Sequence, residues 1–409
     1  MSGVVIVGGG LAGARTAEAL REVGYGGDIV ILAGERHLPY DRPPLSKGYL
    51  KGETGLDEVQ LHDQHWYDEH KITVQQGVQV TEIALSDRLV LTDTGQHLGY
   101  EQLVLATGSS PRQLDLPGAD LDGVVYLRTV EDSNRLKELL AAAGSLRLAV
   151  IGGGWIGLEA ASAFADAGAQ VTVLEAQEQP LQNALGVEMG AFFATLHRDH
   201  GVDLRTQVGV AGLTPADGGR RVGSVELTDG TSVPADLVLV GIGAAPNIDL
   251  ARNAGLTLDN GVVVDGQGRT SDPDVFATGD IASYPDPVLG RLRVEHWANA
   301  LNHPPSVAQA ITGGSAAYDK LPFFYSDQYD LGLEYAGRSG PSDALVVRGD
   351  LAAREFVAFW LRDGRLTAGM NVNVWDVTDD IQRLISAQTP VDPARLADPS
   401  VPLDQLADR

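Results

Sequence analysis

The fold of this chain is decided by the stretch VIVGGGLAG at residues 5–13, which recurs 144 positions later as AVIGGGWIG at residues 149–157. In both copies a short apolar strand pattern runs into Gly-x-Gly-x-x-Gly, and an alanine-rich helix pattern follows. The first glycine of this motif allows a tight turn, the second lets the backbone approach a pyrophosphate, and the third lets helix and strand pack closely. The helix N-terminus then faces the phosphates. The two copies predict two dinucleotide-binding units in one enzyme.

The similarity of the two copies extends beyond the glycines. A second apolar strand pattern follows each motif, at residues 29–32 and 171–174, and ends near an acid, Glu35 or Glu175. An acid about 20 residues after the motif is expected to bind an adenosine ribose hydroxyl. The alternative is a pair of ordinary strand–turn–helix units that bind nothing. The repeated acid favours two bound dinucleotides, for which electron transfer between a nicotinamide and a flavin is the usual purpose.

Length and charge limit the remaining possibilities. A chain of 409 residues is long enough for two or three domains, each with its own core. It has no run of about 18 apolar residues, so we expect no membrane span. The first strand begins at Val4, which leaves no room for a signal peptide, and we expect a cytoplasmic protein. The net charge of −25 argues against DNA or an anionic membrane as a partner.

The chain contains no cysteine. This excludes disulfides, thiolate-bound zinc and thiolate-bound iron–sulfur clusters, and we expect no metal site. It also excludes a redox-active thiol. A flavoprotein without thiols must pass its electrons to an acceptor outside itself.

The rest of the chain divides where the pattern changes. Two later apolar stretches, 103–105 and 237–240, each run into a glycine-containing turn. Each dinucleotide-binding unit therefore ends with the same pattern of a strand followed by such a turn. A further stretch ends at Gly279-Asp280, where we expect a carboxylate beside the start of a helix. From about residue 321 alternating apolar residues predict an antiparallel sheet. The proline- and aspartate-rich end, from Pro390, is expected on the surface.

Six short motifs carry a resemblance to a known family over nearly the whole chain. They are PYDRPPLSK at 39–47, ATGSSPR at 106–112, LRT at 127–129, GGGWIGLE at 152–159, ATGD at 277–280 and SDQY at 326–329. In this order they resemble the flavin-dependent pyridine-nucleotide oxidoreductases. The closer similarity is to the NADH-dependent ferredoxin reductases of oxygenase systems, the group of putidaredoxin reductase, rubredoxin reductase and the reductases of aromatic-ring dioxygenases.

The resemblance implies an α/β fold of the glutathione-reductase type, with two Rossmann-like dinucleotide-binding domains and a C-terminal α+β domain. The expected FAD-binding domain is discontinuous and spans residues 1–112 and 247–320. The NADH-binding domain is expected at 113–246, and the C-terminal domain at 321–409.

Carried over by position, the resemblance implies an FAD site around the first glycine motif. Glu35 is similar to the acid on the adenosine ribose, Asp280 to the aspartate on the ribityl chain, and Lys47 to the lysine near the reactive flavin nitrogen. The implied FAD contacts are Gly8, Gly10, Leu11, Ala12, Gly13, Glu35, Arg42, Lys47, Val80, Ala106, Thr107, Gly108, Arg128, Gly279, Asp280, Trp297 and Ala298.

The second motif resembles the NADH site. Glu159 is expected to approach Lys47, and these two are the implied catalytic residues. The implied NADH contacts are Gly152, Gly154, Ile156, Gly157, Glu159, Glu175, Gly243 and Glu295. The residues alone leave simpler roles open: Glu159 could stabilise a helix turn, Trp297 could belong to a core, and Lys47 could lie on the surface.

Two local sequences refine this expectation. NADPH enzymes place an arginine near the end of the second strand, whereas residues 175–178 read EAQE, with two acids and no base, which predicts NADH. The family usually continues past Trp297 with a glutamine-rich helix start, but this chain has Asn302-His303-Pro304-Pro305. Because proline suits a first helical turn, we expect the helix to survive.

The implied function is an NADH:ferredoxin reductase. Electrons would pass from NADH through FAD, one at a time, to a [2Fe–2S] ferredoxin or a rubredoxin that serves an oxygenase such as a haem monooxygenase. Arg291 and Arg293 are candidates for docking an acidic carrier. Two alternatives stay open: an NADH oxidase that reduces oxygen directly, and an NADH-responsive redox sensor similar to apoptosis-inducing factor.

Overall fold

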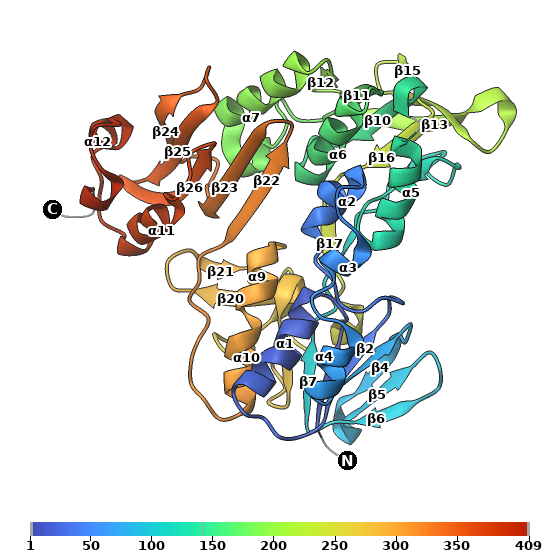
Figure 1. The fold of residues 1–409 in the computed structure, drawn as a ribbon, viewed down its shortest axis with the longest axis vertical. Helices are drawn as coiled ribbons and strands as arrows, with labels where there is room; N and C mark the ends of the chain where they lie inside the picture. The colour runs from blue at the N-terminus through green and yellow to red at the C-terminus, as the bar shows by residue number, and fades with distance from the viewer. Residues whose placement is uncertain (1–2, 142, 407–409) are drawn as a thin grey trace. The chain divides into compact units, whose positions relative to one another are not determined.

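The computed structural model describes residues 3–141 and 143–406, and the chain divides into two compact units (Figure 1). The first unit comprises Met1–Asp41, Leu56–Ser110 and Ala245–Phe324. The second comprises Arg42–Gly55, Pro111–Ala244 and Tyr325–Arg409. Three of the crossing points fall within strands, which are β8 (Ser109–Pro111), β17 (Ala244–Pro246) and β22 (Phe323–Gln328).

A parallel five-stranded sheet forms the centre of the first unit. Its central strand, β1 (Val4–Val7), is an unbroken apolar run and is fully buried, as expected for a parallel strand covered on both faces. Helix α1 (Leu11–Glu22) packs on β1 and on α10 (Pro304–Ile311). The strand order is β19 (Val275–Ala277), β7 (Gln102–Leu105), β1, β2 (Ile29–Ala33) and β3 (Ile72–Gln76).

Smaller elements complete the first unit. Two three-stranded sheets are formed by β4 (Val80–Ala84), β5 (Leu89–Thr92) and β6 (His97–Gly99), and by β18 (Val262–Val263), β20 (Ala282–Asp286) and β21 (Gly290–Leu292). The remaining helices are α3 (Leu56–Val59), α4 (Gln64–Glu69), α8 (Asp249–Asn253) and α9 (Trp297–Asn302).

Two local expectations have different outcomes in this unit. The helix expected after Gly279-Asp280 is wrong: a single 3-10 turn, Gly279–Ile281, leads directly into strand β20. Ala282 and Ser283 of β20 pair with β18, and Tyr284 to Asp286 pair with β21, so strand pairing prevails over a helix here. The helix at the double proline does survive, because α10 begins at Pro304, where a missing backbone N–H costs no helical hydrogen bond.

The second unit contains a matching parallel sheet. Its order is β12 (Asp203–Arg205), β11 (Gln170–Leu174), β10 (Arg147–Ile151), β16 (Leu237–Val240) and β9 (Val124–Val125). An antiparallel sheet of β13 (Val210–Pro215), β14 (Val222–Leu227) and β15 (Ser232–Pro234) accompanies it. The helices are α2 (Gly48–Lys51), α5 (Val130–Leu140), α6 (Trp155–Asp166) and α7 (Gln182–Asp199).

The C-terminal part of the second unit is the expected antiparallel sheet with helices. Its strand order is β22 (Phe323–Gln328), β23 (Leu331–Gly337), β26 (Arg365–Val372), β25 (Glu355–Arg362) and β24 (Ala344–Asp350), followed by α11 (Thr378–Ala387) and α12 (Pro393–Ala397). The chain's last segment is not wholly on the surface as expected. Val391, Leu396, Leu403 and Leu406 are buried, because their apolar side chains gain more by packing than by exposure.

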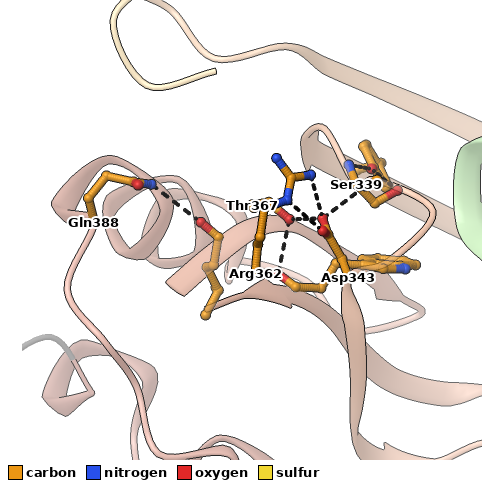
Figure 2. Close-up of polar contacts among 9 residues, drawn as sticks. Ser339, Asp343, Arg362, Thr367 and Gln388 are labelled. Atoms are coloured by element: carbon orange, nitrogen blue, oxygen red, sulfur yellow. Dashed lines mark hydrogen bonds and ion pairs between the residues drawn. The ribbon is translucent and has the colours of Figure 1, made fainter. Parts of the chain in front are cut away.

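A hydrogen-bonded carboxylate stabilises this sheet (Figure 2). Asp343 accepts from Arg362 Nε at 2.8 Å, from Thr367 Oγ1 at 2.6 Å and from the backbone N–H of Gly340 at 2.8 Å. Burial of the carboxyl opposes ionisation, but these donors outweigh it and hold the pKa of Asp343 below its ordinary value. Nearby, Ser339 Oγ donates to the carbonyl of Ala184 in α7 at 2.6 Å, which ties the sheet to the rest of this unit.

Candidate functional site

The first glycine turn leaves room for a ligand at the start of α1. Gly8 has φ +127°, and a Cβ on Gly13 would lie 2.0 Å from the carbonyl oxygen of Gly8, so both positions need glycine for the backbone itself. A Cβ on Gly10 would meet nothing within 4 Å. Gly10 is also the N-cap of α1, which has no side-chain cap and no acid in its first turn. An open helix N-terminus of this kind fits a pyrophosphate.

The second glycine turn repeats this arrangement in the other unit. Gly152 has φ +102°, and a Cβ on Gly157 would lie 2.4 Å from the carbonyl oxygen of Gly152. At Gly154, the N-cap of α6, the nearest atom to an added Cβ is 3.6 Å away, and again no side chain caps the helix. The large apolar side chains of Ile156 and Ile242 stand exposed beside this turn, which fits a surface that a bound cofactor covers.

The two acids beyond the turns are held in defined positions. Glu175 accepts from the backbone N–H groups of Gly153 and Gln177, both at 2.7 Å, so its carboxylate lies against the second glycine turn. Glu35 accepts a hydrogen bond from the Tyr40 hydroxyl in the first unit. Both acids occupy the end of the second strand, where the sequence predicts them.

Asp280 lies near the start of α1. A Cβ on Gly279 would come within 2.8 Å of the Cβ of Ala12, which places the 279–280 turn against the helix. Asp280 Oδ2 accepts from Ser109 Oγ at 2.6 Å, and the side chain is 8% exposed. A buried carboxylate in a turn beside a helix N-terminus can bind hydroxyl groups of a ligand.

The predicted contacts from β7 and β4 also lie in the first unit. Residues 106–108 follow the end of β7, where Asn247 exchanges two 2.8 Å hydrogen bonds with Thr107. The backbone of Ala106 lies against Gly8, because a Cβ added to Gly8 would lie 2.1 Å from the carbonyl oxygen of Ala106. Val80 is buried at the start of β4.

Helix α9 begins at a half-buried aromatic residue, Trp297. Trp297 Nε1 donates to Asp41 Oδ1 at 2.8 Å, and burial nevertheless raises the pKa of that carboxyl above its ordinary value. Ala298 is buried beside it, whereas Glu295 is exposed and pairs with Arg293 at 2.7 Å. Arg291 donates to the carbonyl oxygen of Ser283 at 2.6 Å. Both arginine side chains therefore already have a hydrogen-bond or ion-pair partner within this chain.

The second unit contains the most unusual group, a buried charge pair. Lys47 Nζ lies 2.7 Å from Glu159 Oε1, and the two side chains are 15% and 3% exposed. Ser326 Oγ donates to Oε1 of Glu159 at 2.6 Å and Ser46 Oγ donates to Oε2 at 2.5 Å. The Lys47 ammonium also lies 5.5 Å from the centre of the Tyr325 ring. Such a pair is costly to bury and is kept where its charges are used.

The other predicted residues of this unit shape the backbone around the pair. Arg42 Nη1 donates to the carbonyl oxygen of Arg128 at 2.6 Å, joining the segment before Lys47 to the start of α5. Gly243 has φ +97° and its carbonyl accepts from the N–H of Arg112 at 2.9 Å.

Sequence reasoning found the charge pair but missed the groups that surround it. Ser46 and Ser326 stand in the motifs quoted for the resemblance, next to Lys47 and at the start of SDQY, and their hydroxyls complete the Glu159 site. Tyr40 and Asp41, also within the first motif, were not expected to bond Glu35 and Trp297. No periodicity marks such partners: Tyr40 lies five residues from Glu35, and the other three contacts join segments more than 100 positions apart.

Comparison with known proteins agrees with this geometry. Residues 2–303 match the family model described as pyridine nucleotide-disulphide oxidoreductase, and residues 323–407 match one described as reductase C-terminal. The chain belongs to the pyridine nucleotide-disulphide oxidoreductase family. It is 42% identical over 404 residues to the ferredoxin–NAD(+) reductase component of the anthranilate 1,2-dioxygenase system of Burkholderia cepacia, covering 98% of each chain. To putidaredoxin reductase of Pseudomonas putida it is 38% identical over 407 residues, covering 98% of this chain and 96% of the relative.

Solved structures of this family share the whole fold. The chain matches putidaredoxin reductase in its covalent complex with putidaredoxin with a TM-score of 0.95 at 37% identity, covering 99% of this chain and 98% of that one. The ferredoxin reductase for the CYP199A2 system from Rhodopseudomonas palustris gives a TM-score of 0.95 at 34% identity over all of both chains. The expected fold, two Rossmann-like units and a C-terminal α+β part, is confirmed. Among the described residues, no helix has the length and apolar character to cross a bilayer.

Proposed function

We propose that this protein is an FAD-containing NADH:ferredoxin reductase of an oxygenase system. It takes two electrons from NADH and delivers them one at a time to a [2Fe–2S] ferredoxin, with rubredoxin as a variant acceptor. The observation that carries the proposal is the pair of open glycine turns, each at an uncapped helix N-terminus, in a chain whose relatives are named ferredoxin reductases. Cytoplasmic localisation, where NADH is regenerated, belongs to the same proposal.

In this proposal FAD binds at the first turn and NADH at the second. Gly8, Gly10 and the start of α1 receive the FAD pyrophosphate, and Glu35 and Asp280 bind its hydroxyl groups. The matching group at the second turn is Gly152, Gly154 and the start of α6, with Glu175 on the adenosine ribose. The discontinuous FAD domain, the inserted NADH domain and the C-terminal domain keep the boundaries predicted from the sequence. The bound flavin supplies the exchange between two-electron and one-electron chemistry.

Lys47 and Glu159 set the charge at the reacting end of the flavin. An ammonium group stabilises negative charge that develops beside it, so Lys47 favours the electron-rich form of the cofactor. Glu159 fixes the position of that ammonium, and the hydroxyls of Ser46 and Ser326 fix Glu159 in turn. No side chain has to act as an acid or base for NADH to react, because positioning of the two rings is sufficient.

The acceptor must lie outside the chain, since no cysteine is available to take electrons. An oxidase that reduces oxygen directly, and an NADH-responsive sensor, are the competing functions. Arg291 and Arg293 remain candidates for docking an acidic carrier, although both side chains already bond to this chain.

The cofactor assignments can be tested before any partner is known. The purified protein should release FAD on denaturation, and NADH should bleach the flavin absorption anaerobically at a lower concentration than NADPH does. A preparation that binds no flavin, or one that NADH does not reduce, would contradict the proposal.

A further inference from the structure

A polar cavity lies next to the buried charge pair, wholly within the second unit. It has a volume of about 250 Å³, which leaves room for several ordered water molecules. Its walls include the hydroxyls of three residues and both acidic and basic side chains. The lining residues outside the charge pair that bear on its chemistry are Ser46, Lys51, Glu53, Ser162, Asp327 and Tyr329.

Lys47 forms part of the wall of this cavity, so the cavity reaches one member of the charge pair. Asp327 follows Ser326, whose hydroxyl donates to Glu159. Asp327 lines the cavity and is also exposed to solvent. It is therefore placed between the cavity and bulk water.

The charges around Asp327 suit proton exchange. Partial burial and the negative charge of Glu159 raise the pKa of the Asp327 carboxyl, while Lys47 and Lys51 act against this shift, and the net direction is upward. Lys51 pairs loosely with Asp166 at 3.8 Å. Glu53 and the Tyr329 hydroxyl, whose own pKa is raised by burial, complete the titratable groups facing the cavity. A carboxyl with a raised pKa passes protons at moderate pH more readily than an ordinary aspartate.

The balanced reaction shows why such a route is needed. One NADH and two oxidised one-electron acceptors give NAD⁺, two reduced acceptors and one H⁺. The electrons leave with the acceptors, but the proton leaves separately. With FAD bound as proposed, this proton would be released beside Lys47, whose side chain is 15% exposed.

We infer that the cavity is the exit path of this proton and that Asp327 is its last relay before solvent. The Lys47 ammonium gives one proton to water in the cavity, the water passes a proton beside the Ser46 hydroxyl to the Asp327 carboxylate, and the proton released by the reaction then restores the ammonium. The inference rests on the proposed function for the position of Lys47. It assigns a role to the acidic residue of the SDQY motif, which the fold alone leaves without one.

The test compares Asp327→Asn with Glu53→Gln, which removes another carboxylate of the same cavity. Each holoenzyme is reduced with one equivalent of NADH and mixed with ferricyanide, in weak buffer that contains a pH-indicator dye. Ferricyanide takes single electrons without a specific docking partner, so the result does not depend on which carrier is natural. In Asp327→Asn we expect proton release and flavin reoxidation to slow by about tenfold, with a solvent deuterium isotope effect above that of the wild type. Added formate should restore the rate.

A second readout does not depend on turnover. Infrared titration of the holoenzyme should show an Asp327 carboxyl whose pKa falls when Glu159 is replaced by Gln, because a negative neighbour is lost. Proton release in Asp327→Asn equal to that of Glu53→Gln, with no change in isotope effect, would overturn the relay. An Asp327 pKa that is the same in Glu159→Gln and in the wild type would overturn the relay as well. Failure of NADH to reduce the wild-type flavin would instead overturn the proposed function beneath it.

Discussion

At the scale of single residues, Glu159 depends on three donors. Lys47 neutralises its charge, and the hydroxyls of Ser46 and Ser326 occupy its two oxygens, so the buried carboxylate is fully satisfied. Gln328 Nε2 in turn donates to Ser326 Oγ at 3.3 Å. Removing any of these groups leaves part of a buried charge without a partner, which is the costly case.

Ser326→Ala tests this dependence. We expect the free energy of unfolding to fall by about 1.5–3 kcal/mol, the usual worth of a hydrogen bond to a charged group. Chemical denaturation of the wild type and the variant, both loaded with flavin, measures the difference. Ser326→Thr keeps a hydroxyl on the same carbon and should recover much of the loss. Equal stability of Ser326→Ala and the wild type would show that Glu159 does not need this donor.

In the proposed function Glu175 selects NADH over NADPH, and a double variant tests this role. Its carboxylate is fixed by the N–H groups of Gly153 and Gln177, and its negative charge would repel the 2′-phosphate of NADPH. Glu175→Ala with Gln177→Arg should raise kcat/KM for NADPH relative to NADH by about tenfold, or about 1.4 kcal/mol. The matched control is Glu178→Ala, which removes a nearby acid that is not held at the turn. No gain in NADPH use in the double variant would contradict the assignment.

At the scale of elements, the glycines of one turn should respond differently to the same substitution. Gly13→Ala forces a methyl group to within 2.0 Å of the Gly8 carbonyl, so α1 cannot keep its place on β1 and the protein should be destabilised or fail to fold. Gly10→Ala adds a methyl group where nothing lies within 4 Å. Gly10→Ala should therefore fold with an unchanged circular dichroism spectrum but bind FAD at least about tenfold more weakly. Equal flavin affinity in Gly10→Ala and the wild type would contradict a pyrophosphate at this turn.

Two buried histidines should make the elements that hold them sensitive to acid. His197 in α7 bonds to Gln328 and Tyr329 at the end of β22, and burial lowers its pKa to about 4. His303 at the start of α10 is fully buried, its ring nitrogens have no hydrogen-bond partner among the described residues, and burial lowers its pKa to about 4 too. Both pKa values lie below the unfolded value of 6.5, so below pH 6.5 the unfolded chain binds these protons more readily than the folded protein does. Above pH 6.5 the rings are neutral in both states, and the fold keeps its full stability. This contribution is lost as the pH falls from 6.5 towards 4, by up to about 3 kcal/mol per histidine.

The comparison of His303→Phe with His65→Phe measures this effect. His65 is 78% exposed, so its replacement should leave the loss of stability between pH 7 and pH 5 unchanged. His303→Phe should lose less stability over the same interval, because the unfolded chain has one fewer proton to bind. Thermal unfolding of the two variants at pH 7 and at pH 5 gives the four midpoints that are compared. If His303→Phe lost as much stability between pH 7 and pH 5 as His65→Phe does, the result would contradict a neutral buried ring at His303.

What could be predicted from the sequence follows the range of the interactions involved. The glycine motifs encode a local turn, and both units formed as expected around them. The helix expected after Asp280 did not form, because pairing of β20 with β18 and β21 outweighs the local helix-start signal. Ser326 could not be linked to Glu159, since the contact joins residues 167 positions apart. Long-range polar partners carry no periodic pattern that would reveal them.

At the scale of the whole molecule, composition and family membership support the same chemistry. A chain without cysteine belongs to a family named for disulphide oxidoreductases, so its electrons leave by a route other than a thiol pair. The relatives that match over nearly their full length are named for ferredoxins and oxygenase systems. We therefore infer that the electrons leave this protein through an external one-electron carrier.

The most direct measurement follows NADH oxidation in air, with and without a [2Fe–2S] ferredoxin, and with cytochrome c as the terminal acceptor. We predict slow oxidation by the protein alone and strong acceleration on addition of ferredoxin, with cytochrome c reduced in proportion. Fast oxidation without ferredoxin, unaffected by its addition, would contradict the account and identify the protein as an oxidase.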